Sequence, residues 1–305
     1  GSWTFDNLDA FFKSDSVIAS RLRYTFSKDP NNPTPSAEFS YLQFGLYAQD
    51  IWSVLPNLKL TYGVRMDMYA FPDSPTENPT FAEEFLGLST SELPAPMSIS
   101  PRVGFNWDVN DDKELQLRGG LGLFAGNTPG VWIANQFTNS GMLFSSVNVT
   151  NFNISAQLPG INPFTNWEAL REVVKDNARS EIALTNKDFK MPQVFRANIA
   201  ADYHIGYGII GTLELMYGKN VNEVVYKNLN MKYYEENGEI VKTIDGRNLY
   251  VNPYYDPVSS KFANVIEMSN TNKGYQLSVS AQLQKPFNQG ILPDMSFNLS
   301  YSSLQ

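Results

Sequence analysis

Two stretches near the start of the chain alternate regularly between apolar and polar side chains. In residues 57–70 every second position is apolar or aromatic, and these positions are Leu58, Leu60, Tyr62, Val64, Met66, Met68 and Ala70. The positions between them are almost all polar or small. Successive side chains of a strand point to opposite faces, so this pattern predicts a strand with one apolar and one polar face. Residues 38–53 repeat the pattern and residues 54–57 predict a tight turn, so we expect a hairpin.

The two predicted strands are long for a soluble protein. A strand of about 14 residues spans roughly 45 Å at about 3.3 Å per residue, whereas strands usually contain about 5–6 residues. A strand that crosses a bilayer needs about 9–11 residues. The hairpin therefore fits the wall of a barrel that extends beyond the membrane it crosses.

The same alternation predicts further strands along the chain. They lie at residues 17–26, 99–109, 114–126, 193–205, 208–218, 273–284 and 295–304. Short turns, near Pro56, Asp111 and Gly206 and at residues 285–294, alternate with long excursions at residues 71–98, 127–192 and 219–272. Outer-membrane barrels combine short periplasmic turns with long extracellular loops in this way. A β-sandwich explains the alternating side chains but not this pairing of connections.

The sequence therefore predicts an all-β chain that forms part of a transmembrane antiparallel up-and-down β-barrel. We expect residues 1–305 to belong to one barrel domain, with the three long excursions outside the cell. Bacterial single-chain barrels have an even number of strands, and the predicted number is odd, so further strands are expected. The chain opens on Gly1 and Ser2 and stops inside an alternating pattern, so we expect a piece of a longer protein. Asn7 and Asn166 are placed to cap two helices, the second over residues 166–177.

Composition argues against several other classes. The sequence contains no apolar run of the about 18 residues that a membrane-spanning helix needs. Its formal charge is −8, whereas a nucleic-acid-binding protein would show a basic patch. It contains no cysteine, which excludes disulfides and thiolate metal sites.

Candidate catalytic and metal-binding residues are scarce. His204 is the single histidine and lies on the polar face of a predicted strand, so neither a Ser/His/Asp triad nor a zinc ligand cluster has support. The acidic residues around Asp111 alternate like calcium ligands, but Lys113 stands where an EF-hand loop needs glycine, so we interpret them as a solvated turn. The glycines at residues 119–122 precede no helix and form no phosphate loop. The sequence thus predicts neither an enzyme nor a cofactor.

Six segments resemble a known family of membrane proteins. They are WTFDNLDAFF (residues 3–12), FGLYAQDIW (44–52), LTYGVRMD (60–67), ISPRVGFNWD (99–108), LRGGLGLFAG (117–126) and WIANQFTNSG (132–141). They are similar to the barrel of TonB-dependent outer-membrane receptors of the Bacteroidetes type, in the Oar-like branch. The resemblance implies a barrel of about 22 strands in the bacterial outer membrane, filled by an N-terminal plug that follows a TonB box. Neither the plug nor the TonB box is recognisable in this sequence.

The resemblance also implies partners and a function. The expected partners are outer-membrane lipid and lipopolysaccharide, TonB acting through the plug, a surface lipoprotein and a transported solute, with no nucleic acid. The expected function is TonB-dependent import of a large or scarce solute. A passive pore or a surface-structural barrel without energy coupling is the alternative. A plug and a TonB box upstream of Gly1 would distinguish the two.

Charged residues on the polar faces of the predicted strands form the first candidate site. They are Arg65, Asp67, Arg102, Arg118 and Arg196. In the predicted register these side chains project into the lumen. Buried charges need partners, so we interpret them as pairing with the plug, and direct contact with the solute is the alternative.

The long excursions hold a second group of candidates. Their aromatic side chains either contact the solute, as rings that stack on sugars or grip peptides do, or pack the loops against one another. These residues are Trp132, Phe137, Trp167, Tyr233, Tyr234, Tyr254 and Tyr255. Residues 71–98 also carry five carboxylates and no Lys or Arg. This loop is either a solvated segment held open by repulsion, or Glu83 and Glu84 capture a positively charged or metal-bearing solute.

Overall fold

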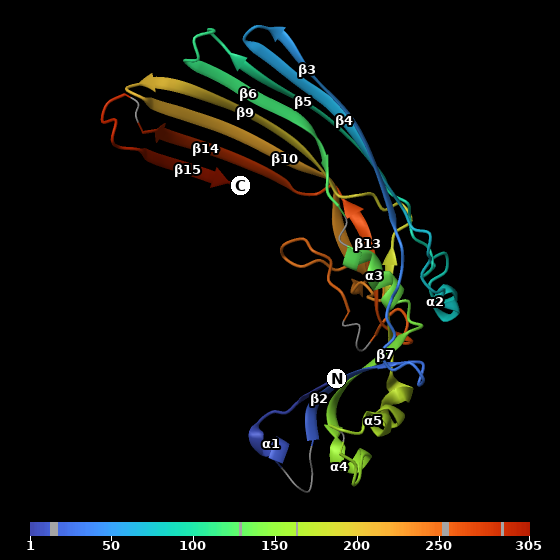
Figure 1. Cartoon of the computed structure of the whole chain (residues 1–305). Coiled ribbons are helices and arrows are strands. Elements are labelled where there is room, and N and C mark those ends of the chain that lie inside the picture. Colours follow the sequence, from blue (N-terminus) through green and yellow to red (C-terminus); the bar gives the residue numbers. More distant parts are fainter. Residues whose placement is uncertain (13–17, 128–129, 163, 252–255, 288–289) are drawn as a thin grey trace.

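A computed structural model describes residues 1–12, 18–127, 130–162, 164–251, 256–287 and 290–305. Its largest part is a curved sheet of ten strands (Figure 1). Eight of these strands, which we call the wall, lie side by side in chain order, each antiparallel to its neighbours. They are β3 (Leu42–Leu55), β4 (Leu58–Ala70), β5 (Met97–Asp108), β6 (Leu115–Ala125), β9 (Gln193–Gly206), β10 (Ile209–Asn228), β14 (Tyr275–Lys285) and β15 (Phe297–Leu304). The predicted antiparallel up-and-down order is confirmed.

The short turns and the long excursions lie at opposite ends of the wall (Figure 1). Residues 56–57 form the two-residue link between β3 and β4. Asp111 and Lys113 adopt positive φ angles of 61° and 62° in the turn between β5 and β6. Tyr207 does the same, with φ 55°, between β9 and β10. The three predicted tight turns are confirmed.

Strand pairing keeps apolar positions of neighbouring strands opposite one another. Leu46 lies opposite Met66 in the β3–β4 pair, and Leu60 lies opposite Phe105 in the β4–β5 pair. Opposite residues of an antiparallel pair share a face of the sheet. The wall therefore has one apolar and one polar face, as the alternation predicts. Within the described residues the sheet does not close on itself, and β3 and β15 form its edges.

At the end of the wall that carries the excursions, β10 continues into a second set of strands. It is 20 residues long, and Glu223 to Asn228 pair with β13 (Phe262–Thr271). β13 also pairs in parallel with β8 (Ser180–Thr185). The prediction that this strand ends at residue 218 is wrong, because the strand continues beyond its regular alternation and residues 223–228 are held by a new partner strand.

Two helices pack against these added strands. α2 (Pro79–Glu84) begins after Asn78, whose side chain accepts a hydrogen bond from the Phe81 N–H at 3.1 Å. Its core cluster contains Phe81, Ile182, Leu184, Phe262 and Val265. α3 (Gly130–Thr138) contributes to a second cluster of Ile133, Phe137, Phe189 and Met268. The sequence pattern predicted neither helix within these excursions.

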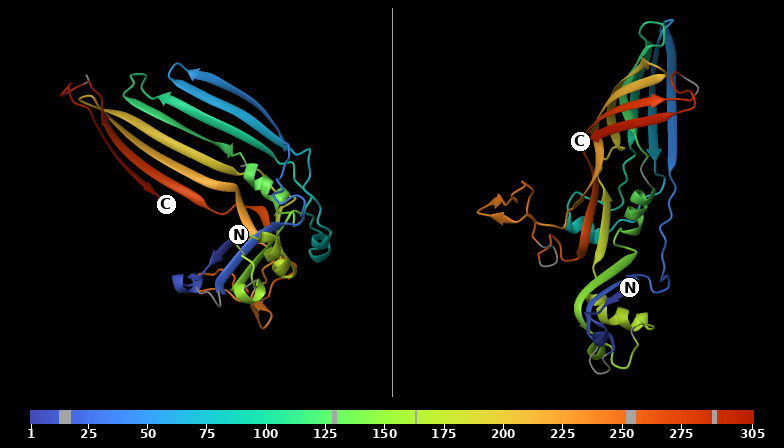
Figure 2. Two further views of the ribbon diagram at one scale, coloured as in Figure 1. Left: turned by 60° about the horizontal axis from the view of Figure 1, so that its bottom comes forward. Right: turned by 90° about the vertical axis from the view of Figure 1, so that its left-hand side faces the viewer.

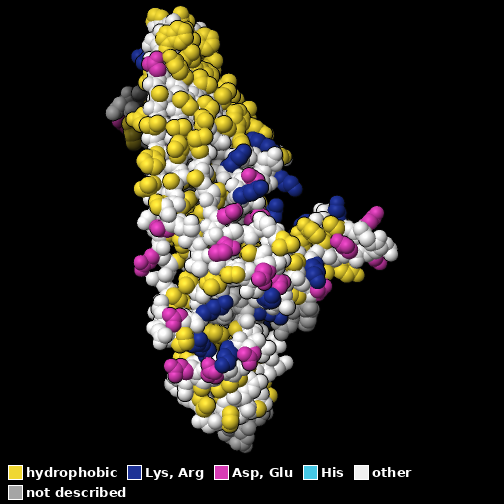
Figure 3. Space-filling view, turned by 90° about the vertical axis from the view of Figure 1, so that its right-hand side faces the viewer, with side chains coloured by type: hydrophobic (Ala, Val, Ile, Leu, Met, Phe, Trp, Pro, Cys, Tyr) yellow, Lys and Arg dark blue, Asp and Glu magenta, His cyan; other side chains and the backbone are white. Residues whose placement is uncertain are grey.

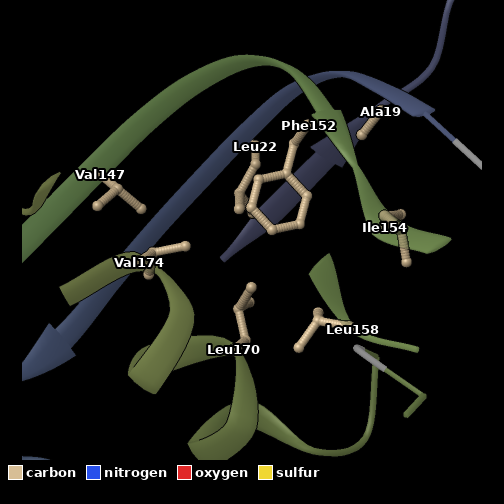
Figure 4. Close-up of a cluster of buried hydrophobic side chains, with 8 residues drawn as sticks. All are labelled: Ala19, Leu22, Val147, Phe152, Ile154, Leu158, Leu170 and Val174. Atoms are coloured by element: carbon tan, nitrogen blue, oxygen red, sulfur yellow. The ribbon is translucent and has the colours of Figure 1, made fainter. Parts of the chain in front are cut away.

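A separate sheet contains β1 (Ser2–Thr4), β2 (Ile18–Ser27) and β7 (Phe144–Asn153), in the order β1-β2-β7. It packs with α1 (Leu8–Phe12), α4 (Ile154–Gln157), α5 (Trp167–Val174) and the 3-10 helix η1 (Lys175–Asn177). The core of this unit consists of Ala19, Leu22, Val147, Phe152, Ile154, Leu158, Leu170 and Val174 (Figure 4). We call the unit the three-stranded module.

The strand predicted at residues 17–26 belongs to this module rather than to the wall. Residues 18–26 match β2, which pairs with β7, and Val17 lies outside the described residues. Both predicted helix caps are present in the module. The Ala10 N–H donates to Asn7 Oδ1 at 2.8 Å, and the Ala169 N–H donates to Asn166 Oδ1 at 3.1 Å.

A hairpin arm, residues 231–251, projects from the excursion end of the molecule (Figure 2). It contains the short strands β11 (Glu235–Glu236) and β12 (Glu239–Ile240). Asn237 and Gly238 join them with φ angles of 53° and 81°. Two positive φ angles are what a type I′ hairpin turn requires, so the predicted Asn-Gly hairpin is confirmed.

Candidate functional site

The five charged wall residues lie on the polar face of the sheet. Gly63, Arg65 and Asp67 are successive alternate positions of β4, so they share one face of the sheet. Gly63 lies opposite Arg102 of β5. Gly122 of β6, which shares a side of that strand with Arg118, lies opposite both Arg102 and Arg196. The register thus brings together side chains from β4, β5, β6 and β9.

Arg65 is paired within its own strand. Its Nε donates to one Asp67 carboxylate oxygen at 2.8 Å and its Nη2 donates to the other at 2.7 Å. Gly45 of β3 lies opposite Asp67, and a Cβ at Gly45 would lie 3.2 Å from Arg65 Nη2 and from Asp67 Oδ1. The absence of a side chain at Gly45 therefore leaves room for this two-point pair, whose geometry fixes the guanidinium plane.

Arg118 is paired across strands. Its Nε donates to an Asp202 carboxylate oxygen of β9 at 2.9 Å. The Thr212 hydroxyl of β10 donates to the other Asp202 oxygen at 2.6 Å. The Asp202 carboxylate thus links β6, β9 and β10, which are consecutive strands of the wall.

Arg102 and Arg196 differ from these two arginines because neither forms an ion pair among the residues that the structure describes. The Arg102 Cζ lies 6.0 Å from the centre of the Phe124 ring. Both arginines line a shallow hollow of about 300 Å³ on the polar face. The remaining polar-face residues of this hollow are Gly120, Phe124, Asn198 and Met216. The wall therefore presents two neighbouring cations without a carboxylate of its own.

Most carboxylates of the acidic excursion have partners. Asp73 accepts a hydrogen bond from the Ser40 N–H at 2.7 Å. Glu77 accepts hydrogen bonds from the Ser89 hydroxyl at 2.5 Å and the Ser91 N–H at 3.1 Å. Burial alone would raise the pKa of Glu77, but these hydrogen bonds outweigh it and lower the pKa.

Glu84 and Glu83 stand in different environments. Glu84 forms an ion pair with Lys261, at 2.7 Å, and the hydrogen bond from Lys261 lowers the pKa of Glu84. Among the described residues the carboxylates of Glu83 and Glu92 form no hydrogen bond or ion pair. Repulsion within residues 71–98 is therefore weaker than their composition indicates, and Glu83 is the freer of the two predicted capture residues.

Two of the candidate aromatic residues pack against other parts of the chain. Phe137 is 9% exposed and stacks on Phe39, with ring centres 4.7 Å apart. Trp132 is half-buried and meets the Tyr226 ring edge-on at 6.4 Å. Both belong to or border the cluster under α3, which favours the loop-packing interpretation for these two residues.

The other predicted aromatic residues are more open. Trp167 of α5 stacks on Tyr24 of β2, with ring centres 5.4 Å apart. Tyr233 packs against Tyr250 at 4.9 Å on the hairpin arm, where Tyr234 is also exposed. Tyr254 and Tyr255 lie outside the described residues. The candidates thus divide between α3, α5 and the arm, and the structure does not bring them into one site.

No group of three or more His, Cys, Asp or Glu residues that could hold a metal ion is found in the described part of the chain. His204 is exposed on the polar side of β9. The backbone around Asp111 forms a turn, in which both carboxylate oxygens of Asp108 accept hydrogen bonds from the Lys113 N–H at 3.1 Å. None of the described helices is long and apolar enough to span a membrane.

Three functional partners escaped the reasoning from sequence. Asp202 alternates with Arg196 on β9, so its place on the polar face was predictable, but its partner Arg118 follows only from the strand order. Lys261 belongs to a different excursion from Glu84, and no sequence pattern connects them. Tyr24 was assigned to a wall strand, although it stacks on Trp167 in the three-stranded module.

The distribution of side chains defines the class of protein. Large apolar residues such as Leu46 and Leu213 stay 67% and 59% exposed on the apolar face of the wall. Figure 3 shows hydrophobic side chains covering the strand region, while charged side chains gather lower on the molecule. Long antiparallel strands with an apolar band are the architecture of a bacterial outer-membrane β-barrel.

A family comparison identifies the chain further. The model of the outer membrane beta barrel domain family matches residues 17–303, and the chain belongs to this family. No curated protein matches the sequence. The predicted barrel and its location in the bacterial outer membrane are confirmed, and membrane lipid is the partner of the wall. The Oar-like assignment stays a prediction.

The chain is also similar to solved structures at low identity. The siderophore receptor PirA from Pseudomonas aeruginosa is 12% identical, over 87% of this chain and 35% of that protein, with a TM-score of 0.43. The outer membrane transporter YddB from Escherichia coli is 14% identical, over 87% and 25%, with a TM-score of 0.45. The copper transporter OprC is 13% identical, over 96% and 37%, with a TM-score of 0.43. The chain thus spans between 25% and 37% of these proteins.

Proposed function

We propose that the chain is part of the barrel of a TonB-dependent importer of a large or scarce solute. In this proposal residues 1–305 belong to one barrel domain, and the excursions at residues 71–98, 127–192 and 219–272 are extracellular. TonB acts through a plug inside the barrel, and lipopolysaccharide and a surface lipoprotein are neighbours of the excursions. The sequence resemblance in the six segments supports this function, and one structural observation carries it.

That observation is the contrast among the arginines of the polar face. Arg65 and Arg118 have carboxylate partners within the wall at 2.7 Å and 2.9 Å, whereas Arg102 and Arg196 have none among the described residues. A polar face with two adjacent unpaired cations is complementary to an acidic body in the lumen. A plug with carboxylates towards the wall would supply such a body, and charge-assisted hydrogen bonds to it would replace those that the two arginines lose to water.

Ion conductance of the full-length protein distinguishes an importer from a passive pore without knowledge of the solute. In a planar bilayer bathed in potassium chloride, a plugged barrel should carry no steady current until urea unfolds the plug. A steady current without urea would contradict the importer and establish the passive pore. The periplasmic domain of TonB should also bind the full-length protein and not a variant without its plug.

Variants of the arginines connect this test to the structure. The double substitution Arg102→Gln and Arg196→Gln should lower the urea concentration at which the current appears, because it removes the cations that hold the plug. Arg65→Gln is the matched control, since the partner of Arg65 lies in its own strand. Equal shifts in both variants would mean that the unpaired arginines have no special contact with the plug.

The orientation has its own test in intact cells. Protease added outside should cut within residues 71–98, 127–192 and 219–272 and spare the turns at Pro56, Asp111 and Gly206. Cleavage at the short turns alone would reverse the orientation.

A further inference from the structure

The three-stranded module contains an open cleft of about 680 Å³ between the end of β2, the loop that follows it and α5. Small-molecule sites in proteins usually measure about 300–1,000 Å³. The residues that line the cleft include Tyr24, Phe26, Asp29, Trp167, Glu168 and Arg171. The wall strands contribute none of these residues, so the cleft is distinct from the charged face of the barrel.

Aromatic rings form one continuous side of the cleft. The Trp167 and Tyr24 rings stack with centres 5.4 Å apart and planes 25° apart. Tyr24 and Phe26 are 5.4 Å apart, at 36°. The Arg171 Cζ lies 5.5 Å from the centre of the Phe26 ring, so a guanidinium ends the row. Trp167 remains 36% exposed and offers ring surface to a ligand.

The core of the module holds this row in place. Leu170 and Val174 of α5 are buried beside Leu22 and Phe152 (Figure 4). Trp167 and Arg171 are four residues apart, so they are neighbours along α5, and both line the cleft at the edge of this buried face. The Tyr24 hydroxyl donates to the Trp167 carbonyl oxygen at 3.3 Å, which ties β2 to α5. A platform that is ordered before a ligand arrives loses little entropy on binding.

Polar groups surround the aromatic row with an excess of acceptors. Glu168 is exposed and forms no ion pair among the described residues, whereas Glu172 is paired with Lys175 at 2.5 Å. One Asp29 oxygen accepts a hydrogen bond from the Asn31 N–H at 2.9 Å. Arg171 donates to the Lys28 carbonyl oxygen at 3.4 Å and is the cation of the cleft. Asp29 and Glu168, two carboxylates without a cationic partner among the described residues, face this one guanidinium, so the charge balance of the cleft disfavours an anion.

We propose that this cleft binds a neutral saccharide. A sugar ring presents an apolar C–H face that packs on Trp167, and hydroxyls that donate to Asp29 and Glu168 and accept from Arg171. A proline-rich peptide also packs on aromatic rings, but it needs slots between separate aromatic ridges. Here the Trp167 ring stacks on Tyr24 and the Phe26 ring lies tilted beside Tyr24, so the three rings form a single row without such a slot.

The same chemistry has two sources, the glycan of lipopolysaccharide in the surrounding leaflet and a free oligosaccharide solute. The inference rests on the proposed function in one respect, which is that the cleft lies outside the cell. Binding itself needs neither TonB nor a plug. It is therefore measured by calorimetry on the full-length protein in nanodiscs, apart from any test of transport.

The probes are the neutral oligosaccharides maltohexaose, xylohexaose and chitohexaose, and the uncharged outer-chain oligosaccharide of the cell's own lipopolysaccharide. We expect at least one probe to bind with an affinity that salt leaves unchanged. Trp167→Ala should weaken binding about tenfold, as expected from the loss of a stacking surface. Trp167→Phe, which keeps a ring and the fold, should retain most of the affinity. Tyr234→Ala, at an exposed aromatic residue of the arm, is the matched control and should change nothing.

Each outcome decides the proposal. Binding of a free hexasaccharide identifies a solute, and binding of the lipopolysaccharide-derived glycan alone identifies the membrane as the source. No binding by any probe, equal binding by Trp167→Ala, or tighter binding of decaproline at this cleft would overturn the proposal. A barrel that conducts as an open pore but still binds a saccharide would refute import alone, and a plugged barrel without saccharide binding would refute the cleft alone.

Discussion

The wall and the three-stranded module are built from strands with the same alternation, but they cover their apolar sides differently. In the module Leu22 is fully buried against a core that includes Leu170 of α5. In the wall Leu46 stays 67% exposed, and among the described residues only Tyr69 and Ala200 of the buried hydrophobic residues come from wall strands. The module supplies its own apolar cover, whereas the hydrocarbon of the membrane covers the wall. Alternation alone thus shows that a face will be covered, but not by what.

The largest effect should come from opening the core of the module. Phe152 is 2% exposed, and Phe152→Ala should destabilise the module by about 3–5 kcal/mol, because it removes buried surface and leaves a cavity. Hydrogen exchange on the full-length protein should show lost protection in β2 and β7 with β4 and β5 unchanged. Equal loss in the wall would mean that module and wall unfold as one unit.

A charge on the apolar face of the wall should come next. Val64→Lys, near the middle of β4, should cost about 2–4 kcal/mol in a bilayer if the residue faces lipid at the midplane. Thr61→Lys on the polar face is the control and should cost little. Spin labels at the two positions provide a second measurement. If Val64 reports water and Thr61 reports lipid, the two faces have been assigned the wrong way round.

The cap of α5 should have a smaller effect. Asn166→Ala removes the acceptor of the Ala169 N–H and should destabilise the helix by about 1 kcal/mol. Exchange of the first amides of α5 measures this change. Asn166→Asp keeps an acceptor and should restore protection, while an unchanged helix in Asn166→Ala would show that packing of Leu170 and Val174 alone holds it.

The smallest effect concerns the contact between excursions. The pKa of Glu84 is lowered by the hydrogen bond from Lys261, so the stabilisation is complete above the ordinary carboxyl value of 4.5 and is lost as pH falls through the lowered value. Acidification should therefore lower the protection factors of amides around α2, calculated against the intrinsic exchange rate at each pH. Glu84→Gln should already show the lowered protection factors at neutral pH, and these should not fall further on acidification.

The wall strands were predictable because each one carries its own periodic signal. β4 and β14 begin and end within one or two residues of the alternating stretches. The excursions carry no such signal, since β8 and β13 are covered on both sides and α3 is short. The paired arginines likewise show that a contact between distant strands cannot be predicted from a local pattern. Arg65 and Asp67 are neighbours in one strand, but the Arg118–Asp202 pair depends on β6 and β9 meeting across a long excursion.

One strand joins the two parts of the main sheet. β10 pairs with β14 up to Lys219, with β9 up to Asn222 and with β13 from Glu223, and its register against β9 shifts between Asn220 and Asn222. Asn220 is fastened there, because its N–H donates to the Gly274 carbonyl oxygen at 3.2 Å and its side chain donates to the Lys273 carbonyl oxygen at 3.1 Å.

This arrangement makes β10 a lever with its joint at Asn220. The eight residues of β10 beyond Asn220 extend about 26 Å, so a rotation of about 10° there would displace the far end of β10 by about 5 Å. A change in the two hydrogen bonds of Asn220 would therefore also move β13 and β8, which follow the far end of β10.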